Sequence, residues 1–179
     1  LGKASGVDDI SNEFLKIFLA IPAGFSLVLT LFNSCWAAEE IPGEWWIARI
    51  FALFKQKGNK IDDPESYRPI AILNSLYKLF TKMVEMRLSP HLHPRISKWQ
   101  CGFLPGWSIE NAIFSALRAI EMAERYKFFP VYMLLLDWEK CYDKFLCDPM
   151  LDALRRLGMP PKVIKLLKHI YSNMQFFVG

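Results

Sequence analysis

The chain has 179 residues, 53% of them hydrophobic and 22% charged, with a formal net charge of +4. High apolar content with ordinary charge excludes an intrinsically disordered chain, and the length suits one domain or a large part of one. Residues 49–98 carry ten basic and four acidic side chains, whereas residues 1–48 carry two basic and six acidic ones. A basic middle is compatible with a polyanionic partner.

The spacing of cysteine and histidine argues against a zinc site and against a disulfide framework. The four cysteines form no Cys-x-x-Cys pair, and the three histidines do not stand at ligand spacing to them. We therefore expect a reducing, intracellular compartment. The chain begins at Leu1 rather than Met, and we expect it to be a piece of a longer protein.

The first expected element is a helix that begins at Asn12 and has Ser11 as its N-cap. The following stretch, residues 17–38, carries no charge and is long enough to cross a bilayer. Polar and helix-breaking residues dilute it, and no cationic cluster flanks it. We therefore expect a buried helix pair that is broken near residues 22–24, and no membrane partner.

A β-hairpin is expected next. Residues 46–54 and 67–73 are β-prone, and the polar segment between them contains turn-forming residues. Pro69 restricts the second strand to a sheet edge or a bulge, because proline has no N–H to donate.

The tip of this hairpin is basic. Lys55, Lys57 and Lys60 are expected to face Arg68 across it. A lysine point charge and an arginine fork that converge on one spot suit a triphosphate. The alternative is an ordinary solvated basic turn.

Apolar residues at helical spacing predict four further helices. They cover residues 76–88, 109–123, 151–157 and 163–171. We expect Pro90 and Pro94 to end the first of these helices, Ser108 to cap the second, and Gly158 to stop the third.

Residues 131–136 form a short, fully apolar run, which predicts a buried central strand. Asp137 follows it directly. A buried carboxylate is unfavourable unless it is paired, and a Mg²⁺ ion is one such partner. The alternative is that Asp137 caps the following turn. If the segment after Asp137 turns, we expect Asp143 to form a local hydrogen bond rather than to reach the same metal. The elements together predict an α+β fold that is rich in helices.

Two other features are ambiguous. Residues 100–106 form a Gly/Pro loop whose amides could hold phosphate, but the loop lacks the Lys-Ser/Thr of a P-loop. We expect Trp45 and Trp46 to pack in the interior. Four other aromatic residues could either stack on bases or belong to the core: Tyr77, Trp107, Trp138 and Tyr142.

Taken in order, several segments resemble motifs of non-LTR, LINE-type retrotransposon reverse transcriptases. They are residues 2–16, 41–45, 53–58, 67–75, 100–108 and 136–143. The most specific part is Tyr67-Arg68-Pro69-Ile70, followed at a family-like distance by an Asp-x-x-Lys-x-aromatic-Asp block that begins at Asp137. The resemblance covers nearly the whole chain and implies an RNA-directed DNA polymerase.

The resemblance implies a right-hand polymerase fold with a fingers β-hairpin and a central palm strand. Residues 1–130 would form the fingers and early palm helices. Residues 131–179 would form a palm segment that carries the first catalytic aspartate and stops before the Tyr-x-Asp-Asp motif. The implied partners are an RNA template, a DNA primer and a dNTP, and the implied site of action is the nucleus.

The resemblance also implies roles for five residues. Asp137 would be catalytic and would bind Mg²⁺, of which two ions are expected in the complete enzyme, with the main-chain carbonyl of Trp138 beside it. Arg68 and Lys55 would contact the incoming dNTP. Tyr142 would lie under the sugar and reject a 2′-hydroxyl by steric clash.

The sequence departs from the family pattern at Leu104 and Trp107, where arginine is frequent, which removes two possible phosphate contacts. One aspartate cannot hold two Mg²⁺ ions, so we expect the chain to be inactive alone. The alternatives are a non-catalytic nucleic-acid-binding remnant of a decayed or domesticated element, a structural helical domain, and a group II intron-type reverse transcriptase.

Overall fold

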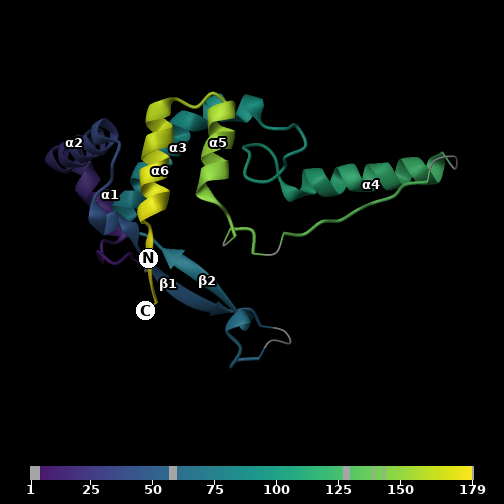
Figure 1. Ribbon diagram of the computed structural model, residues 1–179, viewed down its shortest axis with the longest axis horizontal. Coiled ribbons are helices and arrows are strands. Elements are labelled where there is room, and N and C mark those ends of the chain that lie inside the picture. The colour runs from purple at the N-terminus through teal and green to yellow at the C-terminus, as the bar shows by residue number, and fades with distance from the viewer. Residues whose placement is uncertain (1–4, 57–59, 127–129, 139, 143, 179) are drawn as a thin grey trace. The chain divides into compact units, whose positions relative to one another are not determined.

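The computed structural model describes residues 5–56, 60–126, 130–138, 140–142 and 144–178. The chain divides into two compact units (Figure 1). The first unit combines residues 1–86 with residues 146–179, and the second consists of residues 87–145.

The first unit begins with two helices that meet at a sharp bend. Helix α1 (Asn12–Ala20) begins where predicted, and the Ser11 hydroxyl oxygen accepts the N–H of Phe14 at 3.1 Å. Ile21 is extended, and Pro22 is the first residue of α2 (Pro22–Ala38). Proline is favourable there because the first N–H groups of a helix have no partner within the helix. The predicted break in the uncharged stretch is confirmed, but the helices are only partly buried, since Ile17 and Leu27 are 69% and 64% exposed.

Helices α1 and α2 contain the uncharged stretch, residues 17–38, whose length suits a membrane span. Within the described residues, no single helix is long and apolar enough to cross a membrane. Helices α1 and α2 reach that length and apolar composition only when taken together, and they are bent by 110° relative to each other.

The core of the first unit contains a cluster of four aromatic rings from three elements. Phe32 lies on α2, Trp45 on the 3₁₀ turn η1 (Gly43–Trp46), and Tyr77 and Phe80 on α3 (Ser75–Leu92). The centroids of the contacting rings are 5.3–6.2 Å apart, and Phe80 is fully buried. The predicted packing of Trp45 is confirmed, and Tyr77 belongs to the core.

Helix α3 continues past Pro90, so the prediction that this proline ends the helix is wrong. Pro90 lies in the last turn of α3, where a missing N–H removes only one hydrogen bond near the helix end. The chain then passes into the 3₁₀ turn η3 (His93–Arg95), which contains Pro94.

The described sheet has three strands in the order β2-β1-β3. Strands β1 (Ile47–Phe54) and β2 (Tyr67–Ile72) are antiparallel and form the predicted hairpin, with the 3₁₀ turn η2 (Pro64–Ser66) in their connection. Pro69 lies on the edge strand, as expected. Strand β3 (Gln175–Val178) pairs in parallel with β1 and was not predicted, because four residues carry little periodic signal.

Helices α5 (Cys147–Arg156) and α6 (Pro161–Asn173) complete the first unit and lead into β3. Their buried apolar residues include Leu151 and Leu166. Gly158 has a φ of +80°, a conformation that glycine adopts without steric strain, and it separates the two helices as predicted.

The second unit contains helix α4 (Ile109–Arg125), which begins with a reciprocal capping box between Ser108 and Asn111. The predicted buried strand over residues 131–136 is wrong. These residues form no strand, and Leu134, Leu135 and Leu136 are about four-fifths exposed, at 82%, 83% and 78%. An apolar run becomes a strand only when a neighbouring strand supplies hydrogen bonds, and the described sheet lies in the first unit.

Candidate nucleotide-binding and metal-binding residues

Lys55 and Arg68 lie on the same face of the β1–β2 hairpin. Arg68 pairs with Leu53 across the strands, and the N–H of Lys55 donates to the carbonyl of Ser66 at 2.9 Å. Residues that pair across two strands share a face, and so do alternate residues along one strand. Lys55 and Arg68 are therefore diagonal neighbours, whose side chains can reach one bound group.

The loop that follows β1 is held in place by hydrogen bonds to its main chain. The Lys55 ammonium donates to the Glu65 carbonyl at 2.6 Å, and the Tyr67 hydroxyl donates to the Ile61 carbonyl at 3.0 Å. Lys60 and Arg68 are exposed. Lys57 lies outside the described residues. The hairpin thus keeps two of the predicted cations on one solvent-facing surface, and their contact with a triphosphate stays a prediction.

The other predicted site residues lie in the second unit, on irregular backbone. Asp137 is exposed, as are Trp138 and Tyr142, each at 79%. Asp143 lies outside the described residues. Because Asp137 does not follow a buried strand in this structure, its carboxylate needs no partner to offset burial. Within the described part of the chain, no group of three or more His, Cys, Asp or Glu residues could hold a metal ion.

The Gly/Pro loop before α4 presents apolar side chains to solvent. Phe103 has a φ of +61° and is 94% exposed, and Trp107 is 47% exposed. The Gln100 side-chain amide donates to the carbonyl of Gly102 at 3.1 Å, a local contact at the start of the loop. The Ser108 hydroxyl lowers the pKa of Glu110 by hydrogen bonding at the start of α4.

A buried polar junction, which the sequence analysis did not single out, lies at the end of the hairpin. The side-chain oxygen of Asn74 accepts the N–H of Val7 at 3.0 Å, and its amide nitrogen donates to the Glu44 carbonyl at 2.9 Å. The Ser75 hydroxyl donates to the Ile10 carbonyl at 2.8 Å. Asn74 is 2% exposed. In the sequence, Asn74 and Ser75 form a short polar pair between an apolar strand and a helix. This pattern could have indicated the junction.

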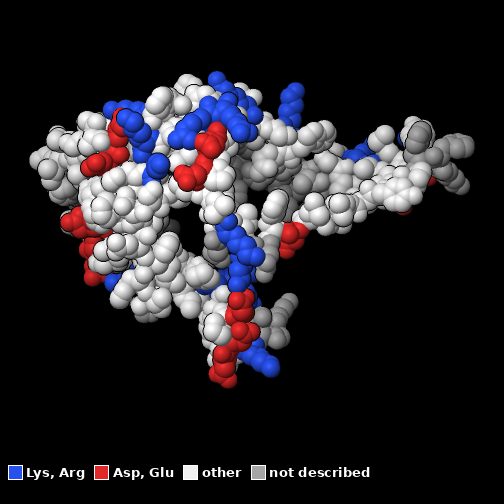
Figure 2. All heavy atoms as spheres, in the orientation of Figure 1, with Lys and Arg blue, Asp and Glu red and all other residues white. Residues whose placement is uncertain are grey.

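Charged residues of both signs occur over the first unit. Figure 2 shows Lys and Arg gathered over α5 and α6, and basic and acidic side chains interspersed along the hairpin toward its tip. Some of the cations are paired: Arg155 contacts Asp152, and the ammonium of Lys165 lies 3.4 Å from the Glu39 carboxylate. The ammonium of Lys162 lies 5.4 Å from the centroid of the Trp36 ring.

A family model described as "Reverse transcriptase (RNA-dependent DNA polymerase)" matches residues 55–178. The chain belongs to the reverse transcriptase family. The matched span of this reverse transcriptase chain includes the five predicted site residues, which are Lys55, Arg68, Asp137, Trp138 and Tyr142.

Individual relatives of this reverse transcriptase chain come from transposable elements. A probable RNA-directed DNA polymerase from transposon BS of Drosophila melanogaster is 28% identical and covers 99% of this chain. The RNA-directed DNA polymerase from mobile element jockey of the same species is 26% identical and covers all of it. A retrovirus-related Pol polyprotein from type-1 retrotransposable element R1 of Bradysia coprophila is 32% identical over 68% of the chain.

The resemblance to non-LTR retrotransposon reverse transcriptases is therefore confirmed. The chain spans 19% of the length of the transposon BS and jockey proteins, and 12% of the R1 polyprotein.

Proposed function

We propose that this chain is part of an RNA-directed DNA polymerase of a non-LTR retrotransposon, which extends a DNA primer along an RNA template with dNTPs. The observation that carries the proposal is its similarity, over 99% of its length, to a protein named as such a polymerase. On the same family grounds, we propose that it acts in the nucleus.

The β1–β2 hairpin would belong to the fingers and would bind the incoming nucleotide. Its register supports this role, because Lys55 and Arg68 share one exposed face. The planar guanidinium of Arg68 would bind two phosphate oxygens, and the Lys55 ammonium would add a second positive charge. Residues 1–130 would form the fingers and early palm helices, and residues 131–179 the palm segment.

Asp137 and the main-chain carbonyl of Trp138 would contribute ligands to Mg²⁺. Their hard oxygen atoms fit this ion, but the described residues supply one carboxylate here and not a complete set of ligands. The remaining carboxylates would come from elsewhere in the complete polymerase. When bound, a pair of such ions activates the attacking hydroxyl and stabilises the leaving group. The Tyr142 ring would exclude a 2′-hydroxyl.

The experiment is primer extension by the complete polymerase that contains this chain. Asp137→Ala should abolish extension and leave template binding largely intact. Asp148→Ala is the matched control, since Asp148 is also an exposed carboxylate but lies in the first turn of α5. Extension that survives Asp137→Ala would remove the metal-ligand role. Loss of extension in both variants would show that Asp137 has no special role.

A further inference from the structure

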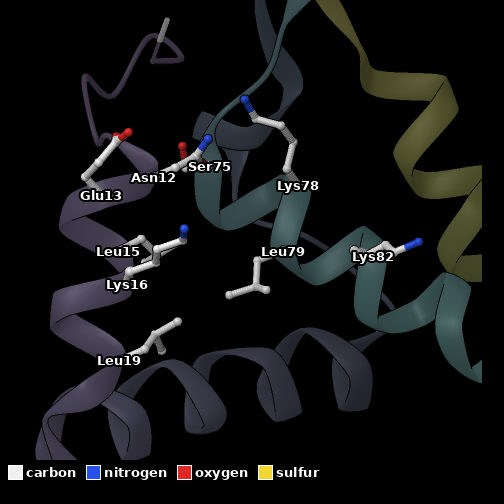
Figure 3. Close-up of a pocket in the computed structure, with 9 residues that line it drawn as sticks. All are labelled: Asn12, Glu13, Leu15, Lys16, Leu19, Ser75, Lys78, Leu79 and Lys82. Carbon is white, nitrogen blue, oxygen red and sulfur yellow. The ribbon is translucent and has the colours of Figure 1, made fainter. Parts of the chain in front are cut away.

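Strand β2, which carries Arg68, is held at both of its ends. Its C-terminal end leads into the buried polar junction of Asn74 and Ser75. Ser75 begins α3 and, together with Asn12 of α1, lines a cavity of about 460 Å³ between these two helices (Figure 3). The N-terminal end of β2 begins at Tyr67, the residue directly before Arg68. The contacts of Tyr67 therefore decide how firmly this end of the strand is held.

The Tyr67 side chain makes two contacts, one through its hydroxyl and one through its ring. The hydroxyl donates a hydrogen bond to the main-chain carbonyl of Ile61 at 3.0 Å, which ties the connection between the strands to the start of β2. The centroid of the ring lies 5.3 Å from that of the Phe54 ring, and Phe54 is the partner of Tyr67 across the strands. Tyr67 thus joins the end of β1, the connection and the start of β2.

Tyr67 and Arg68 lie on opposite faces of the hairpin. Arg68 pairs with Leu53 and Tyr67 pairs with Phe54, and successive residues of a strand point to opposite faces. The Tyr67 ring is therefore behind the face on which Arg68 would hold a triphosphate. An influence of Tyr67 on nucleotide binding must act through the backbone that the two residues share.

The connection before Tyr67 is also held from the face that carries Arg68. There the Lys55 ammonium donates to the main-chain carbonyl of Glu65 at 2.6 Å. Between the two contacts lies Ser66, which is 1% exposed. The backbone that leads into Arg68 is thus fixed on both faces of the hairpin, by Lys55 on one and by Tyr67 on the other.

We infer that Tyr67 is a positioning residue for nucleotide binding, which fixes the start of β2 so that the Arg68 guanidinium meets the triphosphate in one orientation. The inference rests on the proposed role of Arg68 as a triphosphate ligand. A planar guanidinium that binds two phosphate oxygens needs the correct direction as well as the correct distance. A small rotation of the backbone at Tyr67 therefore weakens the contact, although Tyr67 itself does not touch the nucleotide.

The first test is steady-state primer extension by the complete polymerase that contains this chain. Tyr67→Phe keeps the ring beside Phe54 and removes only the hydroxyl. It should raise the apparent KM for dNTP by about three- to fivefold, the order expected for one hydrogen bond, and change kcat by less than about twofold. An unchanged KM would overturn the inference, and so would a fall in kcat at an unchanged KM.

The matched control is Tyr171→Phe, which removes a hydroxyl from a half-exposed tyrosine of the same unit. Tyr171 lies on α6, outside the hairpin, and is 49% exposed. Its substitution should leave the KM for dNTP unchanged. An equal rise in KM in the two variants would show that the Tyr67 hydroxyl has no specific role.

A double-mutant cycle tests whether Tyr67 acts through Arg68. In the Arg68→Ala background the guanidinium is absent, so adding Tyr67→Phe should raise the KM by less than about 1.5-fold. A rise of about three- to fivefold in both backgrounds would show that the two residues act independently, and it would overturn the inference.

A second pair of variants tests the ring contact from its other side. Phe54→Leu removes the aromatic partner of Tyr67 and should raise the KM for dNTP by about twofold, whereas Phe54→Tyr keeps the ring and should leave the KM near its normal value. The same KM in these two variants would contradict a role for the ring contact in positioning Arg68.

These outcomes are separable from the fate of the proposed nucleotide contact. If Arg68→Ala raises the KM and Tyr67→Phe does not, the inference fails while the triphosphate contact of Arg68 stands. If Arg68→Ala leaves the KM unchanged, the proposed contact fails and the inference fails with it. The result of the Asp137→Ala experiment is independent of both.

Discussion

The side-chain amide of Asn74 donates a hydrogen bond to the main-chain carbonyl of Glu44 at 2.9 Å, which joins residues 30 positions apart. The same side chain accepts the N–H of Val7, 67 positions away. Asn74 lies between the end of β2 and the start of α3. It therefore links the N-terminal loop and η1 to the strand that carries Arg68.

Asn74→Ala should lower the free energy of unfolding by about 2–4 kcal/mol. The substitution leaves the N–H of Val7 and the carbonyl of Glu44 without their partner at a buried position, and each unpaired group is unfavourable by about 1–3 kcal/mol. Urea denaturation measures the change. Asn173→Ala is the control, because Asn173 makes one bond, to the His169 carbonyl, and should lose less than about 1 kcal/mol. Equal losses of unfolding free energy in the two variants would mean that the two hydrogen bonds of Asn74 stabilise the fold no more than the one bond of Asn173.

Gly6→Ala should destabilise the same junction by a different mechanism. A Cβ atom at residue 6 would lie 2.3 Å from the side-chain oxygen of Asn74 and 2.6 Å from its Cα atom. Because a backbone atom is involved, a side-chain rotation cannot relieve the clash, and we expect a loss of about 2 kcal/mol. Gly43→Ala should be nearly neutral, since its closest neighbour would be a Trp46 ring atom at 3.7 Å. Thermal unfolding of both variants tests this difference.

Tyr77 should make the fold sensitive to alkaline pH. Burial in the aromatic cluster and, as a smaller cause, the nearby Tyr171 together raise the pKa of Tyr77 to about 12. The neutral phenol is favoured in the folded state, so its contribution is complete below about pH 10 and is lost as the pH rises toward 12. We expect a loss of about 1–2 kcal/mol from this group between about pH 9 and about pH 11.5.

The measurement is urea unfolding at both pH values, with Tyr77→Phe for comparison. The phenylalanine variant cannot ionise at this position and should lose less stability over the same range. Tyr132→Phe is the matched control, because Tyr132 is 91% exposed and its removal should leave the alkaline loss unchanged. The same pH dependence in all three proteins would exclude Tyr77 as the source.

Arg68→Ala in the complete polymerase should raise the apparent KM for dNTP by about tenfold and leave the fold unchanged, because Arg68 is exposed on the edge strand. Arg68→Lys should recover part of the loss, since lysine keeps the charge but lacks the planar fork. Arg156→Ala removes an exposed arginine from α5 and should leave the KM near its normal value. An unchanged KM in Arg68→Ala would reject the triphosphate contact.

Much of the local structure follows from rules that act over a few residues. Ser11 and Ser108 begin helices because their side chains satisfy N–H groups that have no partner within the helix. Pro69 marks an edge strand because it has no N–H to donate. The order of the motifs along the chain is also a property of the sequence alone, and it is sufficient to indicate the reverse transcriptase family.

The strands and the buried junction depend on hydrogen bonds between residues that are far apart in the sequence. The apolar pattern of residues 131–136 allows a strand, but strand formation also requires hydrogen bonds from a neighbour, and in this structure the run stays exposed beside Asp137. Residues 175–178 carry a weaker pattern, yet they form a strand. Helix α6 ends directly before them, and they pair with the edge of β1 that β2 leaves free. Asn74 looks like an ordinary turn residue in the sequence, and its importance follows from partners 30 and 67 positions away. Such partners leave no periodic signal along the chain, since a hydrogen bond depends on the distance in space between two groups and not on their separation in sequence.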